Sequence, residues 1–381
     1  MEWLECTRCN EKTDARLPLW RCPSCGGPLK LRYSVSFTFD EVQESDFSLW
    51  RYRRALPIRD RTAVISLGEG CTPVISADIE GREVLLKQEH LFPSGSFKDR
   101  GAAVMVSKMK ELGIRHAIED SSGNAGAAVA AYCGAAGISC DIYVPEKTSS
   151  GKLAQISASG ARLVRVPGDR AETARRALEA AEDGYYASHT WNPYFFQGTK
   201  TFAYEICEQL NADVPGYIVL PAGNGTLLLG AFLGFRELLE AGIIDRTPRL
   251  IAVQAAACAP LARAFDRGAQ SVEPVQAGDT AAEGIAISNP LRGNEILEAV
   301  RNSGGWCVTV DEKEISSALK EMCLRGFYLE PTAAATLAGV KKAMTAIPER
   351  SRIFSVITGH GLKTGSKIQA LLDKDRPPGE R

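Results

Sequence analysis

Apolar runs and amphipathic stretches alternate along the chain from about residue 83 onward. Short apolar runs bounded by glycine, proline or polar residues predict strands, and apolar residues at helical spacing predict helices. We expect strands at Glu83–Gln88, His116–Glu119, Cys140–Val144, Arg162–Arg165, Tyr217–Leu220, Leu250–Gln254 and Ile353–Ile357. We expect helices at Ser96–Leu112, Gly123–Gly137, Lys152–Ser159, Arg170–Ala181, Gly198–Gln209 and Gly225–Ala241.

This alternation predicts an α/β protein with mostly parallel sheets, because helices return the chain to the same edge of a sheet. The length of 381 residues favours two domains over one. We expect residues 1–35 to form a ribbon-like segment and 36–95 an arm that leads into a large domain. A smaller α/β domain is expected at 96–200, and the rest of the large domain at 201–381. The tail RPPGER is expected to fray.

Composition narrows the possible partners and locations. Of the residues, 45% are apolar and 24% charged, and the net charge is −1, so no basic excess attracts nucleic acid or an anionic membrane. Charges interrupt every hydrophobic stretch, so we expect no transmembrane helix, and the N-terminus does not have the pattern of a signal peptide. Seven cysteines are scattered singly among apolar residues, which favours buried thiols in a reducing cytoplasm.

The other four cysteines stand in two pairs near the N-terminus, 6-CTRC-9 and 22-CPSCGG-27. Each C-x2-C pair fits one edge of a tetrahedron, so together they predict a Zn²⁺ site made by Cys6, Cys9, Cys22 and Cys25. Four thiolates leave no open coordination position, so the metal would be structural rather than catalytic. The alternatives are a ribbon that has lost its metal and a redox-active pair.

Three turns at the carboxyl ends of strands have the composition of ligand-binding loops, which is where open α/β sheets bind ligands. In 220-LPAGNGTLLLG-230, glycines let the backbone approach an anion in front of a helix start. This is a phosphate cradle without the lysine of a Walker A loop, or else a plain tight turn. In 121-SSGNAG-126, a side chain can cap the next helix, or the helix start can bind a carboxylate. The third turn is 358-TGHGLKT-364.

Lys98 lies in 94-SGSFKDRGAA-103, where small residues precede it and Asp99 is the first carboxylate. Considered alone, it has the properties of an ordinary exposed lysine at a helix start. A lysine suited to imine chemistry, together with a phosphate loop that has no lysine, indicates one cofactor in particular. That cofactor is pyridoxal phosphate (PLP), which needs both.

Five motifs in a fixed order resemble those of threonine synthase and its relatives, which are PLP enzymes of the tryptophan-synthase-β fold class, or fold type II. The motifs are SGSFKDRG, SSGNAG, PAGNGT, EPTAA and TGHGLK, and 67-LGEGCTP-73 resembles the segment that precedes them. The resemblance runs from about residue 66 to 364. It implies two doubly wound α/β domains, preceded here by the zinc ribbon that some members also have.

The resemblance also implies a role for each matching position. Lys98 would form the internal aldimine with PLP and later shuttle protons, and Thr358 would face the pyridine nitrogen. The phosphate of PLP would be held by Gly223, Asn224, Gly225 and Thr226. Asn124 would hydrogen-bond the 3-oxygen of PLP, and the α-carboxylate of an amino-acid substrate would be bound at Ser121, Ser122, Gly123 and Asn124. A homodimer is what the family leads us to expect.

The stretch 188-SHTWNPYFFQGTKT-201 departs from the family pattern. Threonine synthases place an asparagine, a serine and an arginine there, toward the phosphate of the substrate. This chain has His189, Thr190 and Phe195 at those positions, and arginine makes a bidentate pair with phosphate that phenylalanine cannot make. Either other cations compensate, with Lys200, His189 and Arg292 as candidates, or the aromatic residues simply pack. Ala125 likewise replaces a usual hydroxyl.

Three functions therefore remain open. The first is threonine synthase, which converts O-phosphohomoserine and water to threonine and phosphate. The second is a threonine-synthase-like β-eliminase or β-replacement enzyme that acts on serine, threonine, diaminopropionate or phosphoserine, as an ammonia-lyase or a cysteate synthase would. The third is an inactive PLP-binding scaffold or a nucleic-acid-binding ribbon, which the presence of Lys98 and all three loops disfavours.

Overall fold

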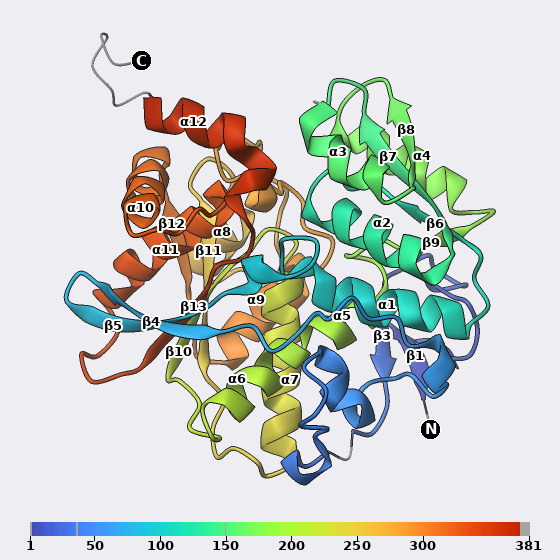
Figure 1. Ribbon diagram of the computed structural model, residues 1–381, viewed down its shortest axis with the longest axis horizontal. Helices are drawn as coiled ribbons and strands as arrows, with labels where there is room; N and C mark the ends of the chain where they lie inside the picture. The colour runs from blue at the N-terminus through green and yellow to red at the C-terminus, as the bar shows by residue number, and fades with distance from the viewer. Residues whose placement is uncertain (1, 36, 149, 374–381) are drawn as a thin grey trace. The chain divides into compact units, whose positions relative to one another are not determined.

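The computed structural model describes residues 2–35, 37–148 and 150–373 (Figure 1). The expectation for the tail RPPGER concerns residues outside these ranges. The chain forms two compact units, each assembled from several stretches of sequence. Unit 1 comprises Met1–Cys71, Phe92–Ser94 and Lys98–Tyr204, and unit 2 comprises Thr72–Leu91, Gly95–Phe97 and Glu205–Arg381. The domain boundaries drawn from the sequence stay a prediction.

A three-stranded antiparallel sheet of order β2-β1-β3 forms the N-terminal part of unit 1. Its strands are β1 (Trp3–Cys6), β2 (Lys12–Asp14) and β3 (Leu29–Arg32). Leu4 and Cys6 alternate with less buried neighbours along β1, as the period of two in a strand dictates. We call residues 2–35 the ribbon. An arm with three 3₁₀ turns follows, η1 (Phe39–Glu41), η2 (Leu49–Ala55) and η3 (Arg61–Ala63).

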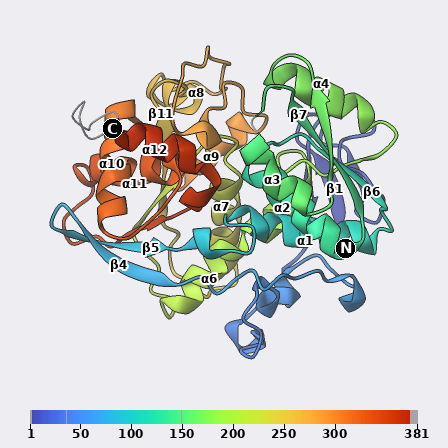
Figure 2. The same ribbon diagram turned by 45° about the horizontal axis from the view of Figure 1, so that its top comes forward.

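A four-stranded parallel sheet of order β8-β7-β6-β9 forms the centre of unit 1. Helices α2 and α4 both pack on β6 and β7, and α2 also contacts α3, beside which it lies in Figure 2. The strands are β6 (His116–Glu119), β7 (Ser139–Pro145), β8 (Arg162–Val166) and β9 (Tyr185–Tyr186). The helices are α1 (Lys98–Glu111), α2 (Asn124–Ala136), α3 (Ser150–Ala158), α4 (Arg170–Ala180) and α5 (Pro193–Thr199).

Unit 2 is built on a six-stranded sheet of order β12-β11-β10-β13-β5-β4. All neighbours are parallel except β4, an edge strand antiparallel to β5. Helix α11 packs against the four strands β10 to β13, and its residues are almost all buried. The strands are β4 (Val74–Ile79), β5 (Arg82–Lys87), β10 (Tyr217–Pro221), β11 (Arg249–Ala255), β12 (Cys307–Val310) and β13 (Ile353–Val356).

The helices that follow these strands complete the α/β pattern in unit 2. They are α7 (Thr226–Glu240), α8 (Pro260–Asp266), α9 (Gly293–Asn302), α10 (Glu312–Leu324), α11 (Pro331–Met344) and α12 (Gly365–Asp373). Short 3₁₀ turns lie at η4 (Glu89–Leu91), η5 (Glu283–Ile285) and η6 (Gly361–Thr364). The α/β class predicted from the sequence is therefore confirmed. Among the described residues, no helix has the length and apolar character needed to cross a bilayer.

One predicted helix needs correction. The helix expected at Gly198–Gln209 is two consecutive helices, α5 (Pro193–Thr199) and α6 (Thr201–Gln209). The first begins earlier because the side chain of Asn192 caps it by accepting from the Tyr194 N–H at 3.1 Å. Pro193 then occupies the first turn, where its missing N–H costs nothing.

Two glycines let α1 and α5 approach each other until hardly any space remains between them. A Cβ atom on Gly198 would lie 1.9 Å from the carbonyl oxygen of Arg100. A Cβ atom on Gly101 would lie 2.3 Å from the ring of Phe195. The ring of Phe195 therefore fills the space that the missing side chain of Gly101 leaves on α1.

We predict that Gly198→Ala lowers the free energy of unfolding by about 1–3 kcal/mol or more, because α5 must move away from a rigid backbone. Gly216→Ala is the control, since its added methyl group would meet only the Arg352 carbonyl oxygen at 3.9 Å. Urea denaturation followed by circular dichroism measures both variants. Equal losses of unfolding free energy in the two variants would show that the close approach of α1 and α5 does not restrict the residue at position 198.

Candidate active site

Lys98 is the first residue of α1, at the amino end where the helix dipole is positive. The next residue, Asp99, is fully buried and accepts a hydrogen bond from the Ser94 N–H at 2.7 Å and another from the Ser94 hydroxyl. These bonds fix the turn that leads into the helix. The ammonium nitrogen of Lys98 lies 5.6 Å from the centre of the Phe195 ring. Within unit 1, the lysine thus lies against an apolar ring.

The Ser121–Asn124 loop joins the carboxyl end of β6 to the start of α2. The N-cap residue is Gly123, which has no side chain, and no side chain caps the helix. The alternative expectation, a side-chain cap at this junction, is therefore wrong. The Gly123 N–H donates to the Ser121 hydroxyl at 3.3 Å. A Cβ atom on Gly126 would lie 1.8 Å from the Ser121 carbonyl oxygen, so the loop folds tightly over the first turn of α2. The N–H groups of that turn suit an anion.

His189 is buried and forms a pair with Glu119, the last residue of β6. Its Nδ1 lies 3.0 Å from a Glu119 oxygen, and its backbone N–H donates to the other oxygen at 3.2 Å. Burial, and after it the charges of Lys98 and Arg170, lower the pKa of His189 well below its ordinary value. Burial, and after it the charge of Asp120, raises the pKa of Glu119 well above the ordinary value of a glutamate.

The rest of the stretch that departs from the family pattern lies around this pair. Phe195 is fully buried, and its ring meets the His189 ring edge-on with centroids 5.9 Å apart. The hydroxyl of half-buried Thr190 lies 3.1 Å from that of Ser188. Lys200 donates to the Tyr33 hydroxyl at 2.8 Å, and its ammonium lies over the rings of Tyr33 and Tyr204. Phe195 and Lys200 thus have packing roles in unit 1.

The glycine-rich loop of unit 2 connects β10 to α7. Gly225 is the N-cap of α7 and has a left-handed backbone with φ of 65°, which favours glycine. A Cβ atom there would lie 2.3 Å from Ile296, and one on Gly223 would lie 2.9 Å from the Ile285 backbone. No larger residue fits at either position, and Thr226 opens the helix directly after them. This tight backbone in front of a helix start suits a phosphate.

Thr358 follows β13 and is fully buried in unit 2. Its hydroxyl donates to a carboxylate oxygen of Glu330 at 3.2 Å, and its carbonyl oxygen accepts from the Phe97 N–H at 3.1 Å. The Glu330 N–H in turn donates to the Gly359 carbonyl oxygen at 3.0 Å. The motif EPTAA contains Glu330, to which the sequence analysis assigned no role. An acidic residue directly before an apolar helix could have indicated a buried carboxylate with a polar partner. Arg292 is also buried in unit 2, where its side chain pairs with Glu295 at 3.1 Å.

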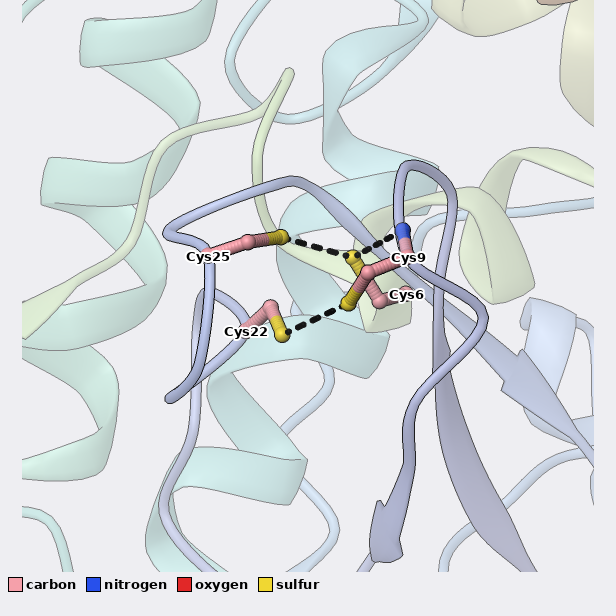
Figure 3. Close-up of side chains that lie close together, drawn as sticks. All are labelled: Cys6, Cys9, Cys22 and Cys25. Carbon is pink, nitrogen blue, oxygen red and sulfur yellow. Dashed lines mark hydrogen bonds between the residues drawn. The ribbon is translucent and has the colours of Figure 1, made fainter.

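The four N-terminal cysteines come together in the ribbon (Figure 3). Their sulfur atoms all lie within 4.8 Å of one another, with 3.4 Å between Cys6 and Cys25 and 3.6 Å between Cys9 and Cys22. A tetrahedral zinc with Zn–S bonds of about 2.3 Å would separate its sulfur ligands by about 3.8 Å. Burial opposes ionisation of Cys6, but N–H groups of Cys9 and Arg8 point at its sulfur and lower the pKa to about 7. The donor set therefore fits Zn²⁺.

Comparison with known proteins identifies the class. Residues 65–359 match the pyridoxal-phosphate dependent enzyme family, and the chain belongs to that family. Among its curated relatives is the threonine synthase of Methanocaldococcus jannaschii, which is 34% identical over 373 residues. That match covers 94% of this chain and 92% of the relative. The threonine synthase of Methanosarcina acetivorans is also 34% identical, over 95% of this chain and 92% of its own length.

Solved structures agree with this assignment at the level of the fold. The processed form of threonine deaminase isoform 2 from Solanum lycopersicum superposes with a TM-score of 0.71, at 22% identity and 90% coverage of each chain. Maize serine racemase superposes with a TM-score of 0.67, at 22% identity, over 80% of this chain and 92% of its own. The comparisons confirm a PLP-dependent lyase with the fold type II architecture and the predicted resemblance to threonine synthase and its relatives.

We predict that His189→Gln changes how the stability of the protein depends on pH. A depressed histidine pKa means that the folded state keeps neutral imidazole while the unfolded chain takes up a proton below about pH 6.5, so the wild type loses stability as the pH falls from there. The loss from this residue is at most about 1.4 kcal/mol per pH unit. Urea denaturation at pH 7 and pH 5.5 should show a smaller loss in His189→Gln.

Thr190→Ser is the control, since it changes the residue next to His189 without adding or removing a titratable group. It should keep the pH dependence of the wild type. An unchanged slope in His189→Gln would contradict the idea that buried His189 is neutral.

Proposed function

We propose that Lys98, Asn124, Gly223, Asn224, Gly225, Thr226 and Thr358 hold the PLP of this enzyme, each in the role that the family resemblance implies. In unit 2, the impossibility of a side chain at Gly223 and Gly225 supports a cradle for the cofactor's phosphate. In unit 1, Lys98 is the first residue of α1 and its ammonium nitrogen lies 5.6 Å from the centre of the Phe195 ring, and this half-buried position at a helix start supports its role as the lysine that binds the cofactor. Thr358, oriented by Glu330, would meet the pyridine nitrogen.

When bound, PLP draws electrons away from the Cα atom of an amino acid and so eases loss of a proton or a substituent. The residues of the chain must then bind and orient the substrate. Ser121, Ser122, Gly123 and Asn124, with the uncapped start of α2, would bind its α-carboxylate. Lys98 would remove the proton at Cα and return one later, which requires its nitrogen to lie within hydrogen-bond distance of that carbon's proton.

The reaction that we propose is that of threonine synthase, O-phosphohomoserine and water to threonine and phosphate. The observation that carries it is 34% identity to threonine synthases over nearly the full length of both chains. The two matches cover 94% and 95% of this chain, and therefore most of both units. His189 and Thr190 would then approach the distal end of the substrate in unit 1, with hydrogen-bond donors in place of a guanidinium.

A second candidate is a β-eliminase or β-replacement enzyme of the threonine-synthase-like kind, acting on serine, threonine, diaminopropionate or phosphoserine. The observation that favours it is the buried ring of Phe195 against Lys98. A ring offers no charge-assisted donor to a phosphate, so it suits the substrates of this group without a phosphate, whose hydroxyl or amine leaving group needs a proton rather than a cation. Lys200 has its ammonium over the rings of Tyr33 and Tyr204 in unit 1, which further favours serine, threonine or diaminopropionate over phosphoserine within this group.

We further propose that the ribbon binds one structural Zn²⁺ through Cys6, Cys9, Cys22 and Cys25, and that the enzyme works as a cytoplasmic homodimer. The sulfur–sulfur distances and the N–H groups directed at Cys6 support the metal. The scattered free thiols support a reducing compartment, and the dimer rests on the family resemblance alone.

We predict that the purified holoenzyme converts O-phosphohomoserine to equal amounts of phosphate and threonine, as a phosphate assay and amino-acid chromatography would measure. Lys98→Ala should lower turnover by about a thousandfold or more, because the group that binds the cofactor and moves the proton is lost. Lys110→Ala, an exposed lysine on the same helix, is the matched control and should keep activity. A keto acid from serine, threonine or phosphoserine with no phosphate from O-phosphohomoserine would select the second candidate.

We predict one zinc per chain by metal analysis of freshly purified protein. Cys22→Ala should abolish zinc binding and lower the melting temperature, because metal binding supplies much of the folding free energy of so small a segment. Cys323→Ser, a half-buried thiol outside the ribbon, should retain the metal. Zinc well below one equivalent in the wild type would refute the four-sulfur site.

A further inference from the structure

The segment Tyr185–Thr199, which we call the wall segment, lies in contact with the ribbon along much of its length in unit 1. Trp20 of the ribbon meets Tyr186 edge-on, with centroids 5.2 Å apart, and Trp191 in the same way at 5.7 Å. The Tyr194 hydroxyl donates to the carbonyl oxygen of Ala15 at 2.9 Å. The ribbon and the wall segment share one buried hydrophobic cluster, so no layer of solvent separates them.

Helix α5, within the wall segment, packs on the ribbon with one face and on α1 with another. Tyr194 and Gln197 are three residues apart and share the face toward the ribbon, where Gln197 accepts from the Tyr33 hydroxyl at 3.0 Å. Phe195 and Gly198 are likewise three apart and face α1. The glycine contacts given above place both of them directly against the backbone or the small residues of α1.

The face toward α1 carries Phe195, whose ring lies close to Lys98. The ring of Phe195 lies under the ammonium nitrogen at 5.6 Å and against the ring of His189. Because a Cβ atom on Gly101 would collide with this ring, a small rotation or shift of α5 has no room to be absorbed locally. Any movement of α5 therefore changes what surrounds the lysine.

Helix α5 is too short to hold its own position. It has seven residues, about two turns, and helices of this length are not stable without tertiary contacts. Its position is therefore set by the two surfaces on which it packs, α1 on one side and the ribbon on the other. Helix α1 carries Lys98 and so already has a role in the proposed chemistry, whereas the ribbon has none.

We propose that the ribbon is a positioning element of the active site, and that Trp20, Tyr33 and Tyr194 are positioning residues that fix Phe195 and His189 relative to Lys98. This rests on the proposed role of Lys98 as the residue that binds the cofactor. The ribbon thereby acts on the substrate side of the lysine without contacting substrate. Its metal would serve the same purpose indirectly, since it holds the strands that carry these residues.

The test compares four variants of the zinc-loaded holoenzyme. Trp20→Ala removes both edge-on contacts, and Tyr194→Phe removes only the hydroxyl that bonds to Ala15. Tyr33→Phe removes the hydroxyl that bonds to Gln197 and also contacts Ala55 and Lys200. Trp3→Ala is the matched control, because this ribbon aromatic has its cation contact within the ribbon, with Lys12 at 5.4 Å. The readout is visible circular dichroism of the bound cofactor, which is achiral and owes its signal to asymmetric surroundings.

We expect the three positioning variants to change the sign or size of this signal, whereas Trp3→Ala should not. With the substrate that turnover assays identify, KM should rise by about threefold to tenfold while kcat changes less, because binding geometry is disturbed more than the lysine itself. Lower melting temperatures with an unchanged cofactor signal in all three variants would overturn the proposal and leave the ribbon a stabilising module.

The spectroscopic readout needs no substrate, so it separates this proposal from the proposed reaction. If neither O-phosphohomoserine nor serine is turned over, the circular dichroism still decides whether the ribbon positions the site. If Trp20→Ala does not fold, the two phenylalanine variants, which keep their rings and lose one hydroxyl each, give the answer.

Discussion

The close approach of α1 and α5 is the constraint on which the arrangement of unit 1 depends. It exists because Gly198 and Gly101 have no side chains where the two helices meet. Helix α1 begins with Lys98, and α5 presents Phe195, so the same contact that packs the two helices brings the ring to the lysine. The contact that packs the two helices therefore also sets the surroundings of Lys98. Neither helix can shift without displacing the other.

Unit 2 uses glycine in a comparable way but for a different purpose. Gly223 and Gly225 are surrounded by Ile285 and Ile296, so their positions exclude any larger residue. In unit 1 the missing side chains make room for a protein ring. In unit 2 they let the loop pack closely against Ile285 and Ile296 in front of a helix start, a position that suits a phosphate. The absence of a side chain thus shapes the backbone locally in each unit.

The sequence predicted most of the strands and helices between residues 83 and 254, because glycines and polar turns separate well-defined apolar runs there. Beyond residue 254 it predicted only β13 and missed helices α8 to α12 and strand β12, and it also missed the edge strand β4. Helix α11 is buried on nearly all sides, so its sequence has little of the contrast between polar and apolar faces on which periodicity depends. Strand β4 is largely solvent-accessible, so its inward face has no clear apolar run.

The motifs also pointed to candidate residues at the ends of elements, with Lys98 at the start of α1 and Thr358 shortly after β13, since order and spacing are local features. They did not predict the pairing of Glu119 with His189, which are 70 positions apart. A buried carboxylate beside a histidine is a property of the folded sheet, and Glu119 reads in the sequence only as the polar end of a short strand. The contacts of Trp20 with Tyr186 and Trp191 were beyond prediction for the same reason.

The charges around His189 determine whether this proposed substrate-binding residue is neutral or protonated. Burial and the nearby charges of Lys98 and Arg170 both oppose a proton on this imidazole, and Arg170 itself pairs with Asp120 at 2.9 Å. A neutral imidazole held by Glu119 can exchange one hydrogen bond with a ligand but cannot form an ion pair with it. If His189 faces the substrate as proposed, it is therefore better suited to orient a leaving group through a hydrogen bond than to neutralise a doubly charged one. A phosphate there would draw its counter-charge from a cation outside the wall segment.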